Sequence, residues 1–124
     1  MATDAEDTDF MAKLVNVYPN GYEALVLDQP FRLRYRDSLE HPVRSEKNQA
    51  YRIRINLWST ALRFQTGHKI ALHVSSSNSP RFERHSNTWV PTASYSDAVT
   101  AHNRVYRDKD HPSALVLPVV KLKE

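Results

Sequence analysis

Apolar and polar side chains alternate along several short stretches of the chain, which is the pattern of β-strands with one buried face. The alternation is most regular at 31–36 and 51–58, where arginine or asparagine separates the apolar residues. Strands are predicted at 10–17, 24–27, 31–36, 51–58, 69–75, 98–106 and 114–120. No segment has the period of an amphipathic helix, so the pattern predicts an all-β sandwich.

The strand at 69–75 shows how these segments depend on one another. Ile70, Leu72 and Val74 fall on one face, opposite Lys69 and His73. An apolar face of only three residues is not stable alone, so the strand needs neighbours in a larger sheet.

Turn signals and composition mark the boundaries of the predicted elements. The Asn-Gly pair at Asn20 and Gly21 predicts a tight hairpin turn between 10–17 and 24–27. The nearly continuous apolar run at 114–120 predicts a strand that is buried on both faces or lies at the centre of a sheet. Residues 1–9 are acidic and polar and are interpreted as a frayed lead-in, which leaves 10–124 as one β-sandwich domain.

Composition narrows the classes of function. The 124 residues include no cysteine and only two glycines, which argues against disulfides, thiolate metal sites and a glycine-rich phosphate loop. A net charge of +3 predicts a solvated surface with no nucleic-acid partner. No apolar run is long enough to span a membrane and the acidic start is unlike a signal peptide, so we expect a cytoplasmic chain.

Arginines recur along two of the predicted strands and raise the question of a binding face. If these strands lie side by side, one basic sheet face is formed by Arg32, Arg34, Arg36, Arg52 and Arg54. Nucleic-acid binding would require aromatic rings on that same face, whereas Phe31, Tyr35 and Tyr51 point the other way. We interpret the row as a solvated face whose arginine stems cover apolar surface, or as a docking face for another domain.

Histidines and carboxylates do not form a convincing metal site in the sequence. His68 and His73 lie on opposite faces of their strand, and a pairing of His73 with His102 has no carboxylate nearby. An acidic cluster is formed by Asp4, Glu6, Asp7 and Asp9, but it lacks the glycine-bearing loop of calcium motifs. We therefore expect no metal and no cofactor.

A long irregular segment between Asn78 and Asp97 carries the best candidates for a binding role. Its aromatic residues Phe82, Trp89 and Tyr95 could hold a ligand or dock a domain, because loops at the end of a sandwich present rings rigidly. The alternative is that the rings cap the open end of the core.

Several sequence motifs are more specific than any periodicity. They are DTDFMAKLVNVYPNG at 7–21, RYRDSL at 34–39, Phe64 with GHKI at 67–70, SSSNSPRF at 75–82, HPS at 111–113 and LVLPV at 115–119. In this order and spacing the chain resembles the C-terminal non-catalytic domain of the CocE/NonD serine hydrolases, which include cocaine esterase, α-amino-acid ester hydrolases and X-Pro dipeptidyl-peptidases. The chain departs from the family pattern at Asn16, Asn20, Ser79 and Trp89.

The resemblance implies a jelly-roll sandwich, similar to galactose-binding domains, that supports an α/β-hydrolase domain carried by the same gene or a separate chain. The Ser-His-Asp triad of the family lies on that other domain, and no Gly-x-Ser-x-Gly elbow exists here, so no catalytic residue is carried over. Whether the chain belongs to an enzyme is left open. The alternative function is a free-standing carbohydrate-binding module that uses the loop at 82–95.

Family members ordinarily have further strand-forming sequence before the motif that begins at Asp7. We therefore expect the sandwich to lack its first strand or strands. The resulting open sheet edge would be filled by a second copy or by a partner chain.

Overall fold

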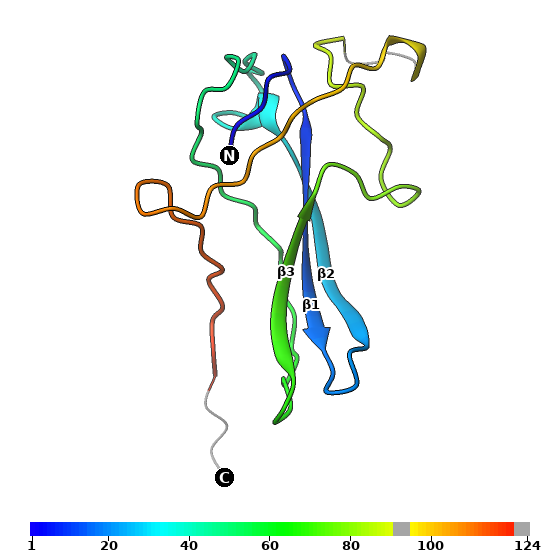
Figure 1. The fold of residues 1–124 in the computed structure, drawn as a ribbon, viewed down its shortest axis with the longest axis vertical. Helices are drawn as coiled ribbons and strands as arrows, with labels where there is room; N and C mark the ends of the chain where they lie inside the picture. Colours follow the sequence, from blue (N-terminus) through cyan, green and yellow to red (C-terminus); the bar gives the residue numbers. More distant parts are fainter. Residues whose placement is uncertain (91–94, 121–124) are drawn as a thin grey trace.

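The computed structural model describes residues 1–90 and 95–120, and its centre is a three-stranded antiparallel sheet in the order β2-β1-β3 (Figure 1). The strands are β1 (Asp9–Val17), β2 (Glu23–Arg32) and β3 (Lys69–Ser75). Two short 3-10 helices, η1 (Leu33–Tyr35) and η2 (Tyr95–Asp97), are the helical elements of these residues. The prediction of an all-β chain is confirmed, and the described part contains no helix able to cross a membrane.

The predicted hairpin joins β1 to β2. Gly21 has φ +86°, a conformation that glycine adopts without strain, and its amide donates to Tyr18 O at 2.9 Å. Asn20 Oδ1 accepts a hydrogen bond from the Tyr22 amide at 3.0 Å and so fixes the turn. The return strand is longer than the predicted 24–27, and its register with β1 shifts at Leu14/Val15.

β1 is the central strand, and its side chains form most of the core. Leu14 pairs with Leu27 on β2 and with Leu72 on β3, so the three leucines share one face of the sheet. Ile70 and Val74 lie on that same face, as the alternation predicts. Ile70 remains 48% exposed and Leu72 40% exposed, because β3 is an edge strand whose apolar face is only partly covered.

The prediction of a strand at 31–36 is wrong beyond Arg32. β2 ends there, and η1 buries both Leu33 and Arg34, which an alternating strand would have placed on opposite faces. The backbone is diverted by the N-terminal segment: the Leu33 amide donates to Thr8 O at 3.0 Å and the Arg34 amide to Asp7 Oδ1 at 2.8 Å. These bonds replace the ladder that would have continued the strand.

Three other predicted strands, at 51–58, 98–106 and 114–120, are not strands in the structure. Of these residues only Arg104 forms a β-bridge, with Ala2. The expectation that 114–120 is buried on both faces is also wrong, because Val116 and Val119 are each 85% exposed. In Figure 1 this segment descends apart from the sheet.

Residues 1–9 are not the frayed, solvated lead-in that their composition suggests. Ala2, Thr3, Asp7 and Thr8 are fully buried. Backbone hydrogen bonds join this segment to Ser45, Asn48, Tyr51 and Arg104, so it packs as part of the molecule.

Candidate functional site

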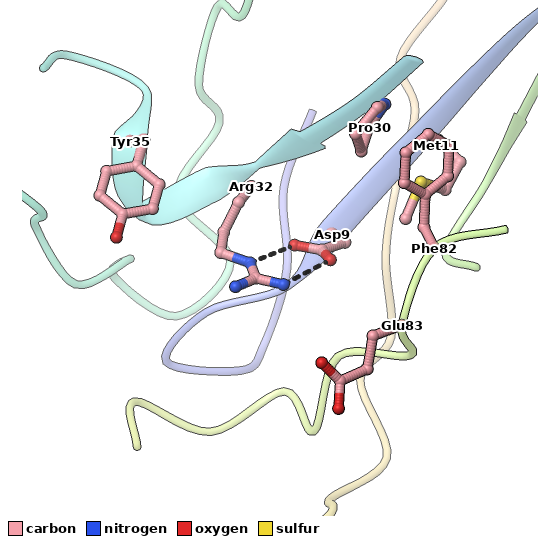
Figure 2. Close-up of a pocket in the computed structure, with 7 residues that line it drawn as sticks. All are labelled: Asp9, Met11, Pro30, Arg32, Tyr35, Phe82 and Glu83. Carbon is pink, nitrogen blue, oxygen red and sulfur yellow. Dashed lines mark hydrogen bonds and ion pairs between the residues drawn. The ribbon is translucent and has the colours of Figure 1, made fainter. Parts of the chain in front are cut away.

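A hollow of about 320 Å³ lies beside the end of the sheet where β1 begins and β2 ends (Figure 2). Its lining comes from both strands, from η1 and from the loop after β3. The residues are Asp9, Met11, Pro30, Arg32, Tyr35, Phe82 and Glu83.

An ion pair forms part of the wall of this hollow. Asp9 and Arg32 are register partners on β1 and β2, and Arg32 Nε and Nη2 donate to the two Asp9 oxygens at 2.8 and 3.0 Å. The hydrogen bonds to Asp9 raise the pKa of the Arg32 guanidinium above its ordinary value. Phe82 and Glu83 contribute to the lining from the loop after β3, and Tyr35 contributes from η1 (Figure 2). The lining contains no serine, cysteine, lysine or histidine, and its titratable side chains are Asp9, Arg32, Tyr35 and Glu83.

A second cluster, formed by Asp7, Arg34 and His85, is buried and separate from the lining of the hollow. Asp7 Oδ2 accepts from Arg34 Nε at 2.5 Å and lies 3.1 Å from His85 Nε2. Arg34 Nη2 also donates to the carbonyl oxygens of Thr88 and Trp89. Burial opposes the ionisation of Asp7, but the hydrogen bonds from His85 and Arg34 outweigh it and hold the pKa of Asp7 below its usual value.

The Asp7–His85 pair resembles the acid–base half of a catalytic triad, yet its hydrogen bonds give it a structural role. His85 Nδ1 accepts the Asn87 amide at 2.9 Å, and a backbone N–H can only donate. His85 Nε2 therefore carries the proton that is shared with Asp7. Both ring nitrogens are occupied, so this histidine has no free atom to take a proton from a nucleophile.

Two of the predicted loop aromatics, Phe82 and Trp89, lie in different parts of the structure. Phe82 lines the hollow, with the Arg81 guanidinium 5.4 Å from its ring centre. Trp89 lies at the buried cluster, with the guanidinium carbons of Arg34 and Arg44 at 4.5 and 5.2 Å from its ring. Tyr95 begins η2, and its side chain, like residues 91–94, lies outside the part that the structure describes.

The arginines predicted to form one basic sheet face are dispersed, and that prediction is wrong. Arg32 is paired with Asp9 and Arg34 is buried with Asp7. Arg36 stacks on the Tyr51 ring at 4.3 Å and donates to the carbonyl oxygen of Val43 at 2.9 Å. Arg52 and Arg54 remain exposed on an extended segment outside the sheet.

The histidines have partners that the sequence did not indicate. His73 Nε2 lies 3.7 Å from Glu23 Oε2, and His102 Nδ1 lies 2.7 Å from Asp4 Oδ2. The expectation that no carboxylate stands near this pair is therefore wrong. His68 Nδ1 lies 2.9 Å from Asn16 Oδ1. Within residues 1–90 and 95–120 no three histidine, aspartate or glutamate side chains converge as metal ligands.

Comparison with known proteins identifies the kind of domain that holds these clusters. The family model of the X-Pro dipeptidyl-peptidase C-terminal non-catalytic domain matches residues 1–116. The chain is 40% identical over 123 residues to a cocaine esterase from Rhodococcus sp. (strain MB1 Bresler), a match that covers 98% of this chain and 21% of the esterase.

Two solved structures give the same result. An α-amino acid ester hydrolase superposes with a TM-score of 0.74 and 33% identity, over 81% of this chain and 18% of the hydrolase. An aminopeptidase from a marine sediment archaeon, Thaumarchaeota archaeon, superposes with a TM-score of 0.82 and 28% identity, over 90% of this chain and 20% of the aminopeptidase. The chain thus spans about a fifth of the length of each relative. The resemblance read from its motifs is confirmed, and the chain belongs to the family of X-Pro dipeptidyl-peptidase C-terminal non-catalytic domains.

Proposed function

We propose that this chain works as the non-catalytic β-sandwich of a CocE-like serine hydrolase, where it supports the catalytic α/β-hydrolase domain and its assembly. A jelly-roll arrangement similar to galactose-binding domains is part of the proposal. The parent enzyme would cleave esters, amides or X-Pro peptides by serine acyl transfer on the other domain. The observation that carries the proposal is the apolar surface that this chain leaves open.

The exposed surface is larger than a compact domain of this mass leaves open. It amounts to 9504 Å², whereas a compact monomer of 14.3 kDa exposes about 6,800 Å². Large apolar side chains contribute to the excess. Those at least two-fifths exposed include Leu25, Leu62, Ile70, Leu72, Trp58, Val99, Val105, Val116, Val119 and Val120. An apolar surface of this extent is typical of an interface with another domain.

The two polar clusters favour a structural contribution of this chain to a parent enzyme over a catalytic one. The carboxylate and the guanidinium that line the hollow are paired with each other, and both ring nitrogens of His85 have partners. Neither cluster pairs a serine or cysteine with a free base. Under this proposal, catalysis by a parent enzyme depends on residues outside this chain.

A domain exchange tests the proposal. The matching segment of the Rhodococcus cocaine esterase is deleted in one variant and replaced by this chain in another, and hydrolysis of p-nitrophenyl acetate is followed after incubation at increasing temperature. We expect the truncated enzyme to lose activity and the exchanged enzyme to regain it, while the isolated chain shows no turnover above background. A truncated enzyme that is as active and as heat-resistant as the intact one would refute the proposal.

A further inference from the structure

The hollow beside β1 and β2 combines apolar and charged groups, and the register of the two strands explains why. Asp9 and Met11 lie two residues apart on β1, so their side chains are on the same face of the sheet. Their register partners on β2 are Arg32 and Pro30. An ion pair and an apolar pair therefore stand next to each other in the lining (Figure 2).

The rest of the lining includes the loop after β3, which is anchored to β2. Asp28 is only 6% exposed, and its Oδ2 accepts a hydrogen bond from Asn78 Nδ2 at 2.8 Å and lies 3.0 Å from Arg81 Nε. The Phe82 amide donates to Asn78 O at 3.0 Å. Phe82 and Glu83 thus line the hollow from a loop that is held in place. Such preorganised groups lose little conformational entropy when a ligand binds.

Two charged groups of the lining have unused hydrogen-bonding capacity. Arg32 pairs with Asp9 through Nε and Nη2, which occupies one edge of its guanidinium. Nη1, on the other edge, donates to no group within residues 1–90 and 95–120, and the Arg32 side chain is 37% exposed. The exposed Glu83 carboxylate also has no hydrogen bond or ion pair in the described part of the chain. One hollow therefore offers a free cationic donor and a free anionic acceptor.

These groups match the three parts of a free α-amino acid. Guanidinium nitrogens bind carboxylates, and a carboxylate binds an ammonium group. The remaining surface, formed by Met11, Pro30 and Phe82, suits an apolar side chain. The volume of about 320 Å³ lies at the lower end of the range of ligand pockets, which is about 300–1,000 Å³, so the ligand should be small. A purely cationic or purely anionic ligand would leave one of the two charged groups without a partner.

We propose that this hollow is a binding site for a free α-amino acid with an apolar side chain, such as leucine. The carboxylate of the ligand accepts from Arg32 Nη1, and its ammonium group donates to Glu83. Its side chain packs against Met11, Pro30 and Phe82. The inference goes beyond the proposed function, and neither depends on the other.

A nitrogen–proton NMR titration of the full chain with four ligands tests the site. L-leucine carries all three recognised parts, L-leucinamide lacks the carboxylate, N-acetyl-L-leucine lacks the ammonium group and glycine lacks the side chain. The titrations are done below neutral pH, where the free amines are protonated. We expect saturable shifts of the Arg32 Nε–H and of the Phe82 and Glu83 amides with leucine. Each of the other three ligands should bind about 10-fold more weakly or worse, because each loses one charged hydrogen bond or the apolar contact.

A pair of variants tests the acidic side of the site without disturbing the interior. Glu83→Gln removes a charge that has no partner in the described residues, and we expect it to weaken leucine binding by about 10-fold. Glu40→Gln is the matched control: Glu40 is also exposed but does not line the hollow, so its loss should leave leucine binding unchanged. The cationic side is tested by leucinamide and not by a variant, because removing Arg32 would leave Asp9, whose side chain is 3% exposed, without its counter-charge.

Each result decides for or against the site. The absence of saturable shifts with leucine, or shifts that lie away from the hollow, would overturn the inference. Leucinamide binding as tightly as leucine would remove Arg32 from recognition, and N-acetyl-leucine binding as tightly would remove Glu83. Either result would overturn the assignment to an amino acid. Equal leucine affinities of the Glu83→Gln and Glu40→Gln variants would do the same.

Discussion

Asp7 and His85, far apart in the chain, meet in the interior with Oδ2 and Nε2 3.1 Å apart and with both side chains buried. Arg34 completes the cluster from η1, so one carboxylate joins the N-terminal segment, the end of the hairpin and the loop after β3. The cluster ties together parts of the chain that share no backbone ladder.

Removing the charge of Asp7 is therefore expected to destabilise the domain strongly. Asp7→Asn leaves the buried Arg34 guanidinium without its counter-charge, which costs about 3–5 kcal/mol for a buried ion pair. Glu6→Gln is the matched control, because Glu6 pairs with Arg44 on the surface and its loss costs below about 1 kcal/mol. Urea unfolding followed by tryptophan fluorescence measures both. Equal losses of stability from the two substitutions would contradict the assignment of Asp7 to a stabilising buried ion pair.

Stability is also expected to fall in acid because of Asp7. Its pKa is lower in the folded chain than in the unfolded chain, so the unfolded chain takes up the proton first as the pH drops. The stabilisation is complete above the ordinary aspartate value of 3.8 and is lost as the pH falls through the lower folded value. Urea midpoints measured from about pH 6 down to about pH 2 should be flat at first and then decline. A urea midpoint that stays constant below the ordinary aspartate value of 3.8 would show that Asp7 does not titrate as described.

The hairpin and the face of β3 could be predicted from the sequence because their signals are local. Asn20 and Gly21 specify the turn, and the alternation of Ile70 and Leu72 fixes which side chains share a face. The same alternation at 51–58 could not tell whether a partner strand lies within these residues, since a pattern of side chains does not identify the backbone that pairs with it.

The burial of residues 1–9 and the Asp7 cluster could not be predicted for a related reason. Acidic composition favours a solvated segment, and only contacts with Arg34 and His85, distant in sequence, reverse that preference. The closely spaced arginines at 32–36 are a signal that counter-charges are needed, but the alternation around them equally favours a solvated face. The 3-10 turn at Leu33–Tyr35 follows from the same distant contacts.

The turn glycine gives a prediction that depends on backbone alone. A Cβ at Gly21 would meet no atom within 4 Å, so the only penalty of Gly21→Ala is the positive φ. We expect a loss of about 1–2 kcal/mol from Gly21→Ala and a smaller loss from Gly21→Asn, since asparagine tolerates this conformation better. Thermal unfolding measures the difference. Alanine tolerated as well as asparagine would mean that the turn changes its conformation.

The proposed function and the carbohydrate-binding alternative predict different results for sugar binding at the loop 82–95. Under the proposed function, calorimetric titration of the chain with glucose or galactose gives no heat of binding. A sugar site would require a free aromatic face, and the Trp89 indole has two guanidinium groups against it. A saturable heat signal that disappears in Trp89→Ala would favour the alternative and count against a purely supporting domain.

Leu14 and Leu72 are cross-strand neighbours, yet they are expected to respond differently to truncation. Leu14 is fully buried on the central strand, so Leu14→Ala should cost about 2–5 kcal/mol in the isolated chain. Leu72 is 40% exposed on the edge strand, so the loss from Leu72→Ala should be well below that of Leu14→Ala there.

If the enzyme covers the apolar face that these leucines share, the cost of Leu72→Ala should rise toward that of Leu14→Ala once the chain replaces the matching segment of the esterase. Thermal inactivation of the exchanged enzyme, with and without each substitution, measures this change. A Leu72→Ala effect that stays small in the assembled enzyme would show that this face remains in solvent. The surface that supports the hydrolase domain would then have to lie elsewhere on the chain, with the exposed valines at 116 and 119 the next to test.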